Sequence, residues 1–130
     1  MKHTISFDDS LWDVVVATSG QANLGGFRAF IEELLTSPRF RPGMNILADH
    51  TNLDAQPLTS EHMRALSGIV IDFDERIGPG LCATVVPSPH KFRLAQTWQK
   101  LVQDHVLMRT GIFYSREFAD GWLRSAQSPA

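Results

Sequence analysis

The sequence predicts a single small α/β domain with a mixed, largely parallel sheet of about five strands and about four helices. The first observation is that short apolar runs alternate with stretches of helical periodicity. The second is that 130 residues make one domain, large enough to bury roughly two-thirds of its unfolded surface without a disulfide. The apolar runs are Val14–Ala17, Met44–Asp49, Leu81–Val86 and Gly111–Tyr114. Such folds bind ligands and partners at the loops that leave the strand ends.

In the first half of the chain, turn and cap residues separate the expected elements. Asn23 is a plausible N-cap for a helix that Pro38 ends. Pro42-Gly43 is a turn that leads into the next strand. The expected segments are an edge strand over 3–7, a strand buried on both faces over 11–18, a turn over 19–23, a helix from 24, a strand ending at 49–50 and a loop over 51–58.

In the second half, a helix is expected to start near Thr59 or Ser60. Ser88 followed by Pro89 is a strong signal for the start of another helix. The remaining segments are a strand over 81–86, a strand over 111–114 and an amphipathic helix over 116–125 with Phe118, Trp122 and Leu123 facing inward. We expect the domain to cover residues 1–126 and residues 127–130 to form a frayed tail.

Composition and charge exclude several classes of protein. The net charge is −2 and both signs are scattered, which argues against a nucleic-acid partner. No apolar run approaches the roughly 20 residues that span a bilayer, and the chain opens in a strand pattern rather than a signal peptide. We therefore expect a cytoplasmic protein. Cys82 lies in an apolar run and is interpreted as a small buried hydrophobe.

No motif for a cofactor, a metal or a nucleophilic serine is present: the phosphate-loop, dinucleotide, zinc-protease, CxxC and nucleophile-elbow patterns are all missing. Asp72-Phe73-Asp74 resembles the aspartate motif of haloacid-dehalogenase-type phosphatases, which implies a magnesium-dependent phosphatase. However, an apolar stripe of helical spacing from Met63 to Phe73 places Asp72 and Asp74 on the flank of a helix. A solvated acidic face is the favoured interpretation, and the phosphatase is kept as an alternative.

Polar residues follow two of the predicted parallel strands. Asp49 and His50 end one strand, and Ser88 and His90 follow another, at the edge where such sheets bind ligands. These four residues are our candidates for a ligand or partner surface. A Ser-His-Asp arrangement that includes Ser88 or Ser60 is conceivable. The favoured explanation is that the fold itself gathers such residues at one edge.

The run Pro38-Arg39-Phe40-Arg41-Pro42-Gly43, followed by an apolar strand that reaches Asp49, resembles SpoIIAA-like, or STAS-type, bacterial domains. Looser similarity continues through Leu81–Val86, Phe92–Ala95, Ile112-Phe113 and Ala119–Leu123. The resemblance implies successive β-α turns, that is, an SpoIIAA-like β-α superhelix in which helices cover a mixed sheet.

In the anti-sigma-factor antagonist members of that family, a partner kinase phosphorylates a serine at the start of the second helix, in the motif Asp-Ser-Ser-Gly. Asp49 matches the strand-end acid, and Thr59 and Ser60 keep the hydroxyl groups, but the aspartate and glycine of the motif are missing. The resemblance implies Ser60 or Thr59 as the phosphoacceptor. An ordinary N-cap role explains the same residues.

Two main functions stay open. The leading hypothesis is a non-enzymatic bacterial regulatory or protein-interaction domain of the STAS type, without a cofactor. The alternative is a small-molecule or lipid-binding module with an apolar ligand between sheet and helices. Its candidate lining is aromatic, although the same side chains could simply fill the core: Phe27, Phe30, Phe73, Phe92 and Trp98.

A homodimer is also expected. The strand over 3–7 has few charges to protect a sheet edge. The last helix places Trp122 beside Phe118 or Leu123, which makes a large apolar patch. Twofold symmetry is the commonest way to cover such surfaces.

Overall fold

A computed structural model describes residues 1–127 of the chain. Its centre is one five-stranded sheet in the order β1-β2-β3-β4-β5, in which β1 is antiparallel to β2 and the other neighbours are parallel. The strands are β1 (Lys2–Ser6), β2 (Val14–Gln21), β3 (Ile46–Asp54), β4 (Leu81–Val85) and β5 (Arg109–Phe113). The predicted fold class, a single α/β domain with a mixed sheet, is confirmed.

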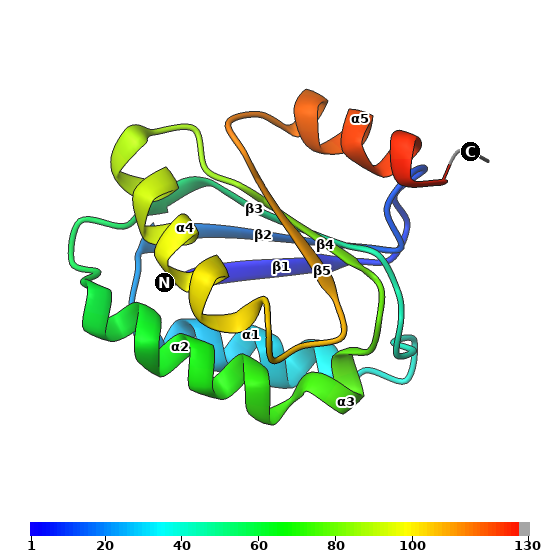
Figure 1. Cartoon of the computed structure of the whole chain (residues 1–130), viewed down its shortest axis with the longest axis horizontal. Helices are drawn as coiled ribbons and strands as arrows, with labels where there is room; N and C mark the ends of the chain where they lie inside the picture. Colours follow the sequence, from blue (N-terminus) through cyan, green and yellow to red (C-terminus); the bar gives the residue numbers. More distant parts are fainter. Residues whose placement is uncertain (128–130) are drawn as a thin grey trace.

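Helices cover both faces of the sheet unequally (Figure 1). The helices are α1 (Leu24–Thr36), α2 (Ser60–Asp72), the short α3 (Asp74–Ile77), α4 (Pro89–Val102) and α5 (Arg116–Gln127). Buried side chains of α1, α2 and α4 share one apolar cluster with Val14 and Val16 of β2. Leu123 of α5 packs in a second, smaller cluster with Leu47 of β3. The larger core therefore lies between the sheet and the helices α1, α2 and α4.

The predicted helix starts are confirmed. The Asn23 side chain accepts a hydrogen bond from the Gly26 N–H at 2.7 Å and caps α1. Thr59 caps α2, and Ser88 caps α4 with Pro89 in the first turn. Local sequence determines these positions because each cap uses the side chain of a residue beside the helix it starts.

The predicted end of the third strand is wrong: β3 continues past His50 to Asp54, through most of the expected loop. A β-bulge allows β3 to continue its pairing with β2 beyond His50. Ala17 pairs with Asp49 and Ser19 with Asn52, so two residues of β3 stand opposite Thr18 alone. The extra residue turns Leu53 into the core, where it is 3% exposed.

The second strand also differs from the prediction, because β2 starts at Val14 and continues through the expected turn to Gln21. Trp12 lies before the strand, in a connector held by the Asp9 carboxylate, which accepts the N–H groups of Leu11 and Trp12 at 3.0 and 2.9 Å. At the other end, the Ala22 N–H donates to the Asp54 carbonyl at 2.8 Å. The apolar residues Leu11 and Trp12 therefore led to the prediction of a strand where the structure has a connector with a buried tryptophan.

The predicted inward face of the last helix is partly wrong. Ala119 and Leu123 are fully buried, one turn apart, whereas Phe118 is 68% exposed. Trp122 is half-buried. Gln127, expected in a tail, is the last residue of α5, and the rest of that tail, 128–130, lies outside the described residues. Among residues 1–127, no helix is long and apolar enough to span a bilayer.

Candidate functional site

The structure divides the predicted strand-edge residues between local roles. The Asp49 carboxylate accepts hydrogen bonds from the N–H and hydroxyl of Thr51, at 2.9 and 2.5 Å. The Ser88 hydroxyl accepts the Lys91 N–H at 3.3 Å, while His90 is exposed in the first turn of α4. Thr59 forms a capping box with His62, and Ser60 is exposed beside it. No hydrogen bond within the described residues joins Asp49, Ser88 and His90.

His50 is not a surface residue, as the prediction of a ligand or partner surface had required. It is 8% exposed, its Nδ1 lies 2.7 Å from the Thr18 hydroxyl, and its ring meets the edge of Phe27 with centroids 5.6 Å apart. Burial lowers the pKa of His50 to about 4; Asp49 opposes this shift and Lys91 adds to it. His50 is therefore neutral at pH 7 and belongs to the wall of an apolar cavity.

The cavity lies between the sheet and helices α1, α2 and α4, and its volume is about 130 Å³. An engineered apolar cavity of about 150 Å³ binds benzene or xenon, so this one has the size for a small organic molecule. Most of the lining is apolar: Val16, Phe27, Phe30, Ile31, Leu34, Leu35, Ile46, Ala48, Leu53, Ala55, Leu58, Met63, Leu66, Val70, Ile77, Val86, Leu94, Ala95 and Met108. The other lining residues are His50, Cys82, Thr84, Lys91 and Trp98.

Small side chains on facing elements explain the space. Ala48 on β3 pairs with Thr84 of β4, two residues along that strand from Cys82, and Ala95 lies on the helix that covers the sheet there. Interiors normally contain few voids larger than a water molecule. At about 24 cal/mol per Å³, a closed and dry cavity of this size would cost about 3 kcal/mol of stability, which is an upper limit for a space that is partly open. Because that cost is large for a small domain, the space needs an explanation.

Cys82 lies on the inner face of β4, as its apolar surroundings in the sequence predict. Burial raises its pKa to about 12, so the group stays protonated at neutral pH. Although β4 is a central strand, Cys82 is only half-buried, and it lines the cavity. Its accessible surface is therefore part of the cavity wall.

The proposed aromatic lining is correct for three of its five members. Phe27, Phe30 and Trp98 line the cavity. Phe73 instead lies beneath the Arg76 guanidinium, 5.4 Å from it, and Phe92 stacks on Tyr114 with ring centroids 4.3 Å apart. Helical spacing identified side chains that face inward, but it does not show which of them border empty space.

The acidic pair lies on helices, as the apolar stripe predicts. Asp72 ends α2 and Asp74 begins α3, where its carboxylate accepts the Leu107 N–H at 2.7 Å. Within residues 1–127, no group of three or more His, Cys, Asp or Glu side chains is placed to hold a metal ion. This placement gives the magnesium phosphatase hypothesis no pair of carboxylates at a strand end.

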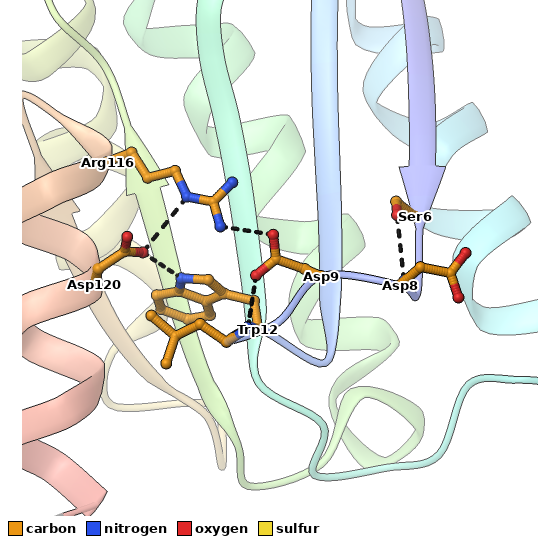
Figure 2. Close-up of polar contacts among 7 residues, drawn as sticks. Ser6, Asp8, Asp9, Trp12, Arg116 and Asp120 are labelled. Atoms are coloured by element: carbon orange, nitrogen blue, oxygen red, sulfur yellow. Dashed lines mark hydrogen bonds and ion pairs between the residues drawn. The ribbon is translucent and has the colours of Figure 1, made fainter.

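A second polar cluster, which the sequence did not reveal, joins both ends of the chain (Figure 2). The Trp12 indole N–H donates to Asp120 at 2.7 Å, and Arg116 lies 2.7 Å from Asp9 and 3.5 Å from Asp120. The Trp12 N–H and the Arg116 guanidinium are the main causes that lower the pKa of Asp9 to about 2. Every charge of the cluster is paired, so its role is to fasten α5 to the β1–β2 connector.

Comparison with known proteins adds no name to this fold. No family model matches the chain, and the searches of curated proteins and of solved structures give no match either. What stands is a small α/β domain with a five-stranded mixed sheet and an apolar cavity under three helices.

Proposed function

We propose that this chain binds a small apolar molecule in the cavity beneath α1, α2 and α4. The observation that carries the proposal is an apolar space of about 130 Å³ inside a domain of only 130 residues. Ligand sites are typically concave, mostly apolar and equipped with a few polar groups. His50 and Thr84 are such groups here. A bound molecule would recover part of the cost of the empty space, which is at most about 3 kcal/mol.

Two measurements test this function. Native mass spectrometry of the protein, purified without denaturation, should show a mass above that of the bare 14.5 kDa chain. Separately, benzene at about 100 times its dissociation constant should stabilise the fold by about 2.7 kcal/mol, which raises Tm.

The matched control is Ala95→Leu, which fills the cavity from α4 with a good helix former. This variant should lose the added mass and the benzene response while it remains folded. A wild-type protein that shows the bare mass and no change in Tm with benzene would contradict the proposed function.

A second candidate, a regulatory domain of the STAS type, is favoured by the position of Ser60. Ser60 is the first residue of α2 and is exposed, while the neighbouring Thr59 hydroxyl is occupied by the cap. A phosphate on Ser60 would meet the positive end of the helix dipole and the N–H groups of the first turn. This arrangement supports control of a protein partner by phosphorylation.

Phosphosite mapping from native cells tests the regulatory candidate, combined with a pull-down that compares wild type with Ser60→Asp and Ser60→Ala. Phosphate at Ser60 and a partner that distinguishes the two variants are expected. An unmodified Ser60 and identical partners for all three proteins would exclude this role.

A further inference from the structure

We infer that the ligand of the cavity is a small neutral alcohol or phenol, and that its hydroxyl group is held between the Thr84 hydroxyl and the Nε2 atom of His50. This inference rests on the proposed function and specifies the chemical class of the ligand. The hydrocarbon part of the ligand, roughly the size of a benzene ring, fills the apolar remainder of the cavity.

Thr84 and His50 lie close together on the face of the sheet that borders the cavity. Side chains alternate between the two faces of a strand, and every second residue of β3 and β4 lines the cavity there: Ile46, Ala48 and His50, and Cys82 and Thr84. Asp49 pairs with Val85 across the two strands. His50 follows the first of these two residues and Thr84 precedes the second, so His50 and Thr84 are diagonal neighbours with Cβ atoms roughly 7 Å apart. One small group between them can therefore reach both.

Both side chains keep a polar atom that has no hydrogen-bond partner within residues 1–127. These atoms are Thr84 Oγ1 and His50 Nε2, because the contact of His50 with Thr18 uses Nδ1. In that part of the chain, Trp98 Nε1 is the one fully enclosed side-chain nitrogen or oxygen without a partner, so Thr84 Oγ1 and His50 Nε2 are not enclosed. Thr84 and His50 are only 7% and 8% exposed and both line the cavity. Their open polar surface therefore faces the cavity.

The contact with Thr18 also fixes the direction of His50 Nε2. The two nitrogens of an imidazole point to different sides of the ring, and Nδ1 lies 2.7 Å from the Thr18 hydroxyl on β2. Nε2 therefore points away from β2, to the side of β3 on which β4 and Thr84 lie. Phe27 and Phe30 contact the ring from α1, with centroids 5.6 and 6.4 Å from that of His50. The side toward Thr84 is left for the ligand.

A hydroxyl group suits this pair because it donates and accepts hydrogen bonds. The single proton of the Thr18 hydroxyl goes either to His50 Nδ1 at 2.7 Å or to the Asp49 carbonyl at 3.5 Å. His50 Nε2 is a donor in the first case and an acceptor in the second. A ligand hydroxyl pairs with Nε2 and with the Thr84 hydroxyl in both cases, whereas a ketone or an ether, which only accepts, pairs with one form of His50.

The same two atoms give a water molecule the minimum of two polar partners. A ligand hydroxyl that takes the place of this water keeps its hydrogen bonds. The hydrocarbon part of the ligand then adds the burial of apolar surface, which water does not provide. An alcohol is therefore a better occupant than water alone.

The electrostatics favour a neutral ligand over an anionic one. His50 is neutral at pH 7 because burial lowers its pKa to about 4. Among the described residues that line the cavity, Lys91 is the one cation, and its Nζ already donates to the carbonyls of His50 and Thr51, both at 3.2 Å. A carboxylate would have to draw Lys91 off these carbonyls or be buried without a counter-ion, which is strongly unfavourable.

Phenol and toluene test the inference because they match in shape, with a methyl group in toluene where phenol has its hydroxyl. Each is titrated into wild type, Thr84→Val and the control Thr4→Val, which makes the same change at an exposed position of β1. Valine keeps the shape of threonine and lacks its hydroxyl. In Thr84→Val the affinity for phenol relative to toluene should fall by about 3–10-fold, the value of one hydrogen bond. Thr4→Val should keep the wild-type ratio.

The imidazole nitrogens provide a second readout that needs no substitution. In ¹⁵N-labelled wild type, phenol should shift the Nε2 resonance of His50 more than toluene does. The Nε2 resonance of His90, which is exposed on α4, is the internal control and should not move.

The outcomes separate this inference from the proposed function. If toluene binds to wild type but phenol does not, if Thr84→Val keeps the wild-type ratio, or if phenol moves the His50 resonance no more than toluene does, this inference is wrong and the proposed function survives. Benzoate that binds more tightly than phenol at pH 7 would also overturn it, in favour of an anionic ligand. If neither phenol nor toluene binds to wild type, both are wrong.

Discussion

His50 is a buried imidazole whose protonation opposes folding. Its pKa is about 4 in the folded protein, against 6.5 for an ordinary histidine. Between these values the unfolded chain takes up a proton that the folded chain does not, so stability falls as the pH drops from about 6.5 to about 4. The slope cannot exceed about 1.4 kcal/mol per pH unit for one proton.

We predict that His50→Gln flattens this part of the stability curve, measured by urea unfolding at a series of pH values. His90→Gln, at an exposed position on α4, is the control and should leave the curve as in wild type. If His50→Gln has the same stability curve as wild type, protonation of His50 is not the cause of the loss of stability between pH 6.5 and 4.

Asp9 affects the stability of the protein in a separate, more acidic pH range. Its pKa is about 2 in the folded protein and 3.8 ordinarily, so its stabilising contribution is present above about pH 4 and is lost as the pH falls to about 2. Asp9→Asn should cost on the order of 1–2 kcal/mol at pH 7 after solvent screening, and the difference from wild type should shrink in acid. Asp8→Asn, whose side chain is 79% exposed, is the matched control and should have little effect. Equal losses for the two variants would argue against the cluster in Figure 2.

At the scale of elements, two buried alanines distinguish open space from close packing. Ala95 on α4 lines the cavity, whereas Ala119 on α5 is fully buried in the second cluster. Ala95→Leu should therefore stabilise the protein by about 0.5–2 kcal/mol. Ala119→Leu should destabilise it by about 1–3 kcal/mol through overpacking. Chemical denaturation measures both, and destabilisation of the same size in both variants would mean that the cavity is not open space.

Two helical glycines offer stabilisation without any effect on the cavity. A Cβ added at Gly68 in α2 or Gly121 in α5 would meet nothing within 4 Å. Each change to alanine should add about 0.5–1 kcal/mol, because glycine is a poor helix former. Gly78→Ala is the opposite control: its φ is +79° and its Cβ would lie 2.4 Å from the Gly43 nitrogen. Thermal unfolding should rank Gly78→Ala below wild type and the other two above it.

Much of this element pattern could be predicted from the sequence because caps and apolar spacing act locally. Asn23, Thr59 and Ser88 mark helix starts correctly for that reason. The strand ends are less local: β3 continues over residues 51–54 because β2 offers it paired backbone and a bulge that returns Leu53 to the core. Because Thr51 and Asn52 are polar and face outward, their sequence does not predict that they pair as a strand.

At the scale of the whole molecule, the candidate site was harder to predict than the fold. The cavity depends on Ala48, Cys82 and Ala95, small residues from three elements that only the packed structure brings together. The ion pair between Asp9 and Arg116 joins residues 107 positions apart. Sequence spacing carries no information on either arrangement. Strand-end position suggested a surface role for His50, but β3 continues beyond it, and His50 lies on the same face of the strand as Ile46 and Ala48, which also line the cavity.

The predicted homodimer is tested by molar mass. Phe118 on α5 is 68% exposed, and β1 lies at an edge of the sheet, so both surfaces proposed for the interface are available. Light scattering at micromolar concentration should give about twice 14.5 kDa. Phe118→Glu should reduce this to the monomer mass if the last helix forms the interface. Leu107→Glu, at a position that is 57% exposed, is the control. A monomer mass for wild type would refute the dimer.

The central claim is that the space beneath α4 is an open, apolar binding cavity. A crystal structure determined under xenon pressure tests it most directly, because xenon enters apolar cavities of this size. The account predicts a xenon peak among Phe27, Cys82 and Trp98, with the surrounding side chains unmoved. A structure without xenon there, in which neighbouring side chains such as Met63 and Met108 fill the space, would contradict it.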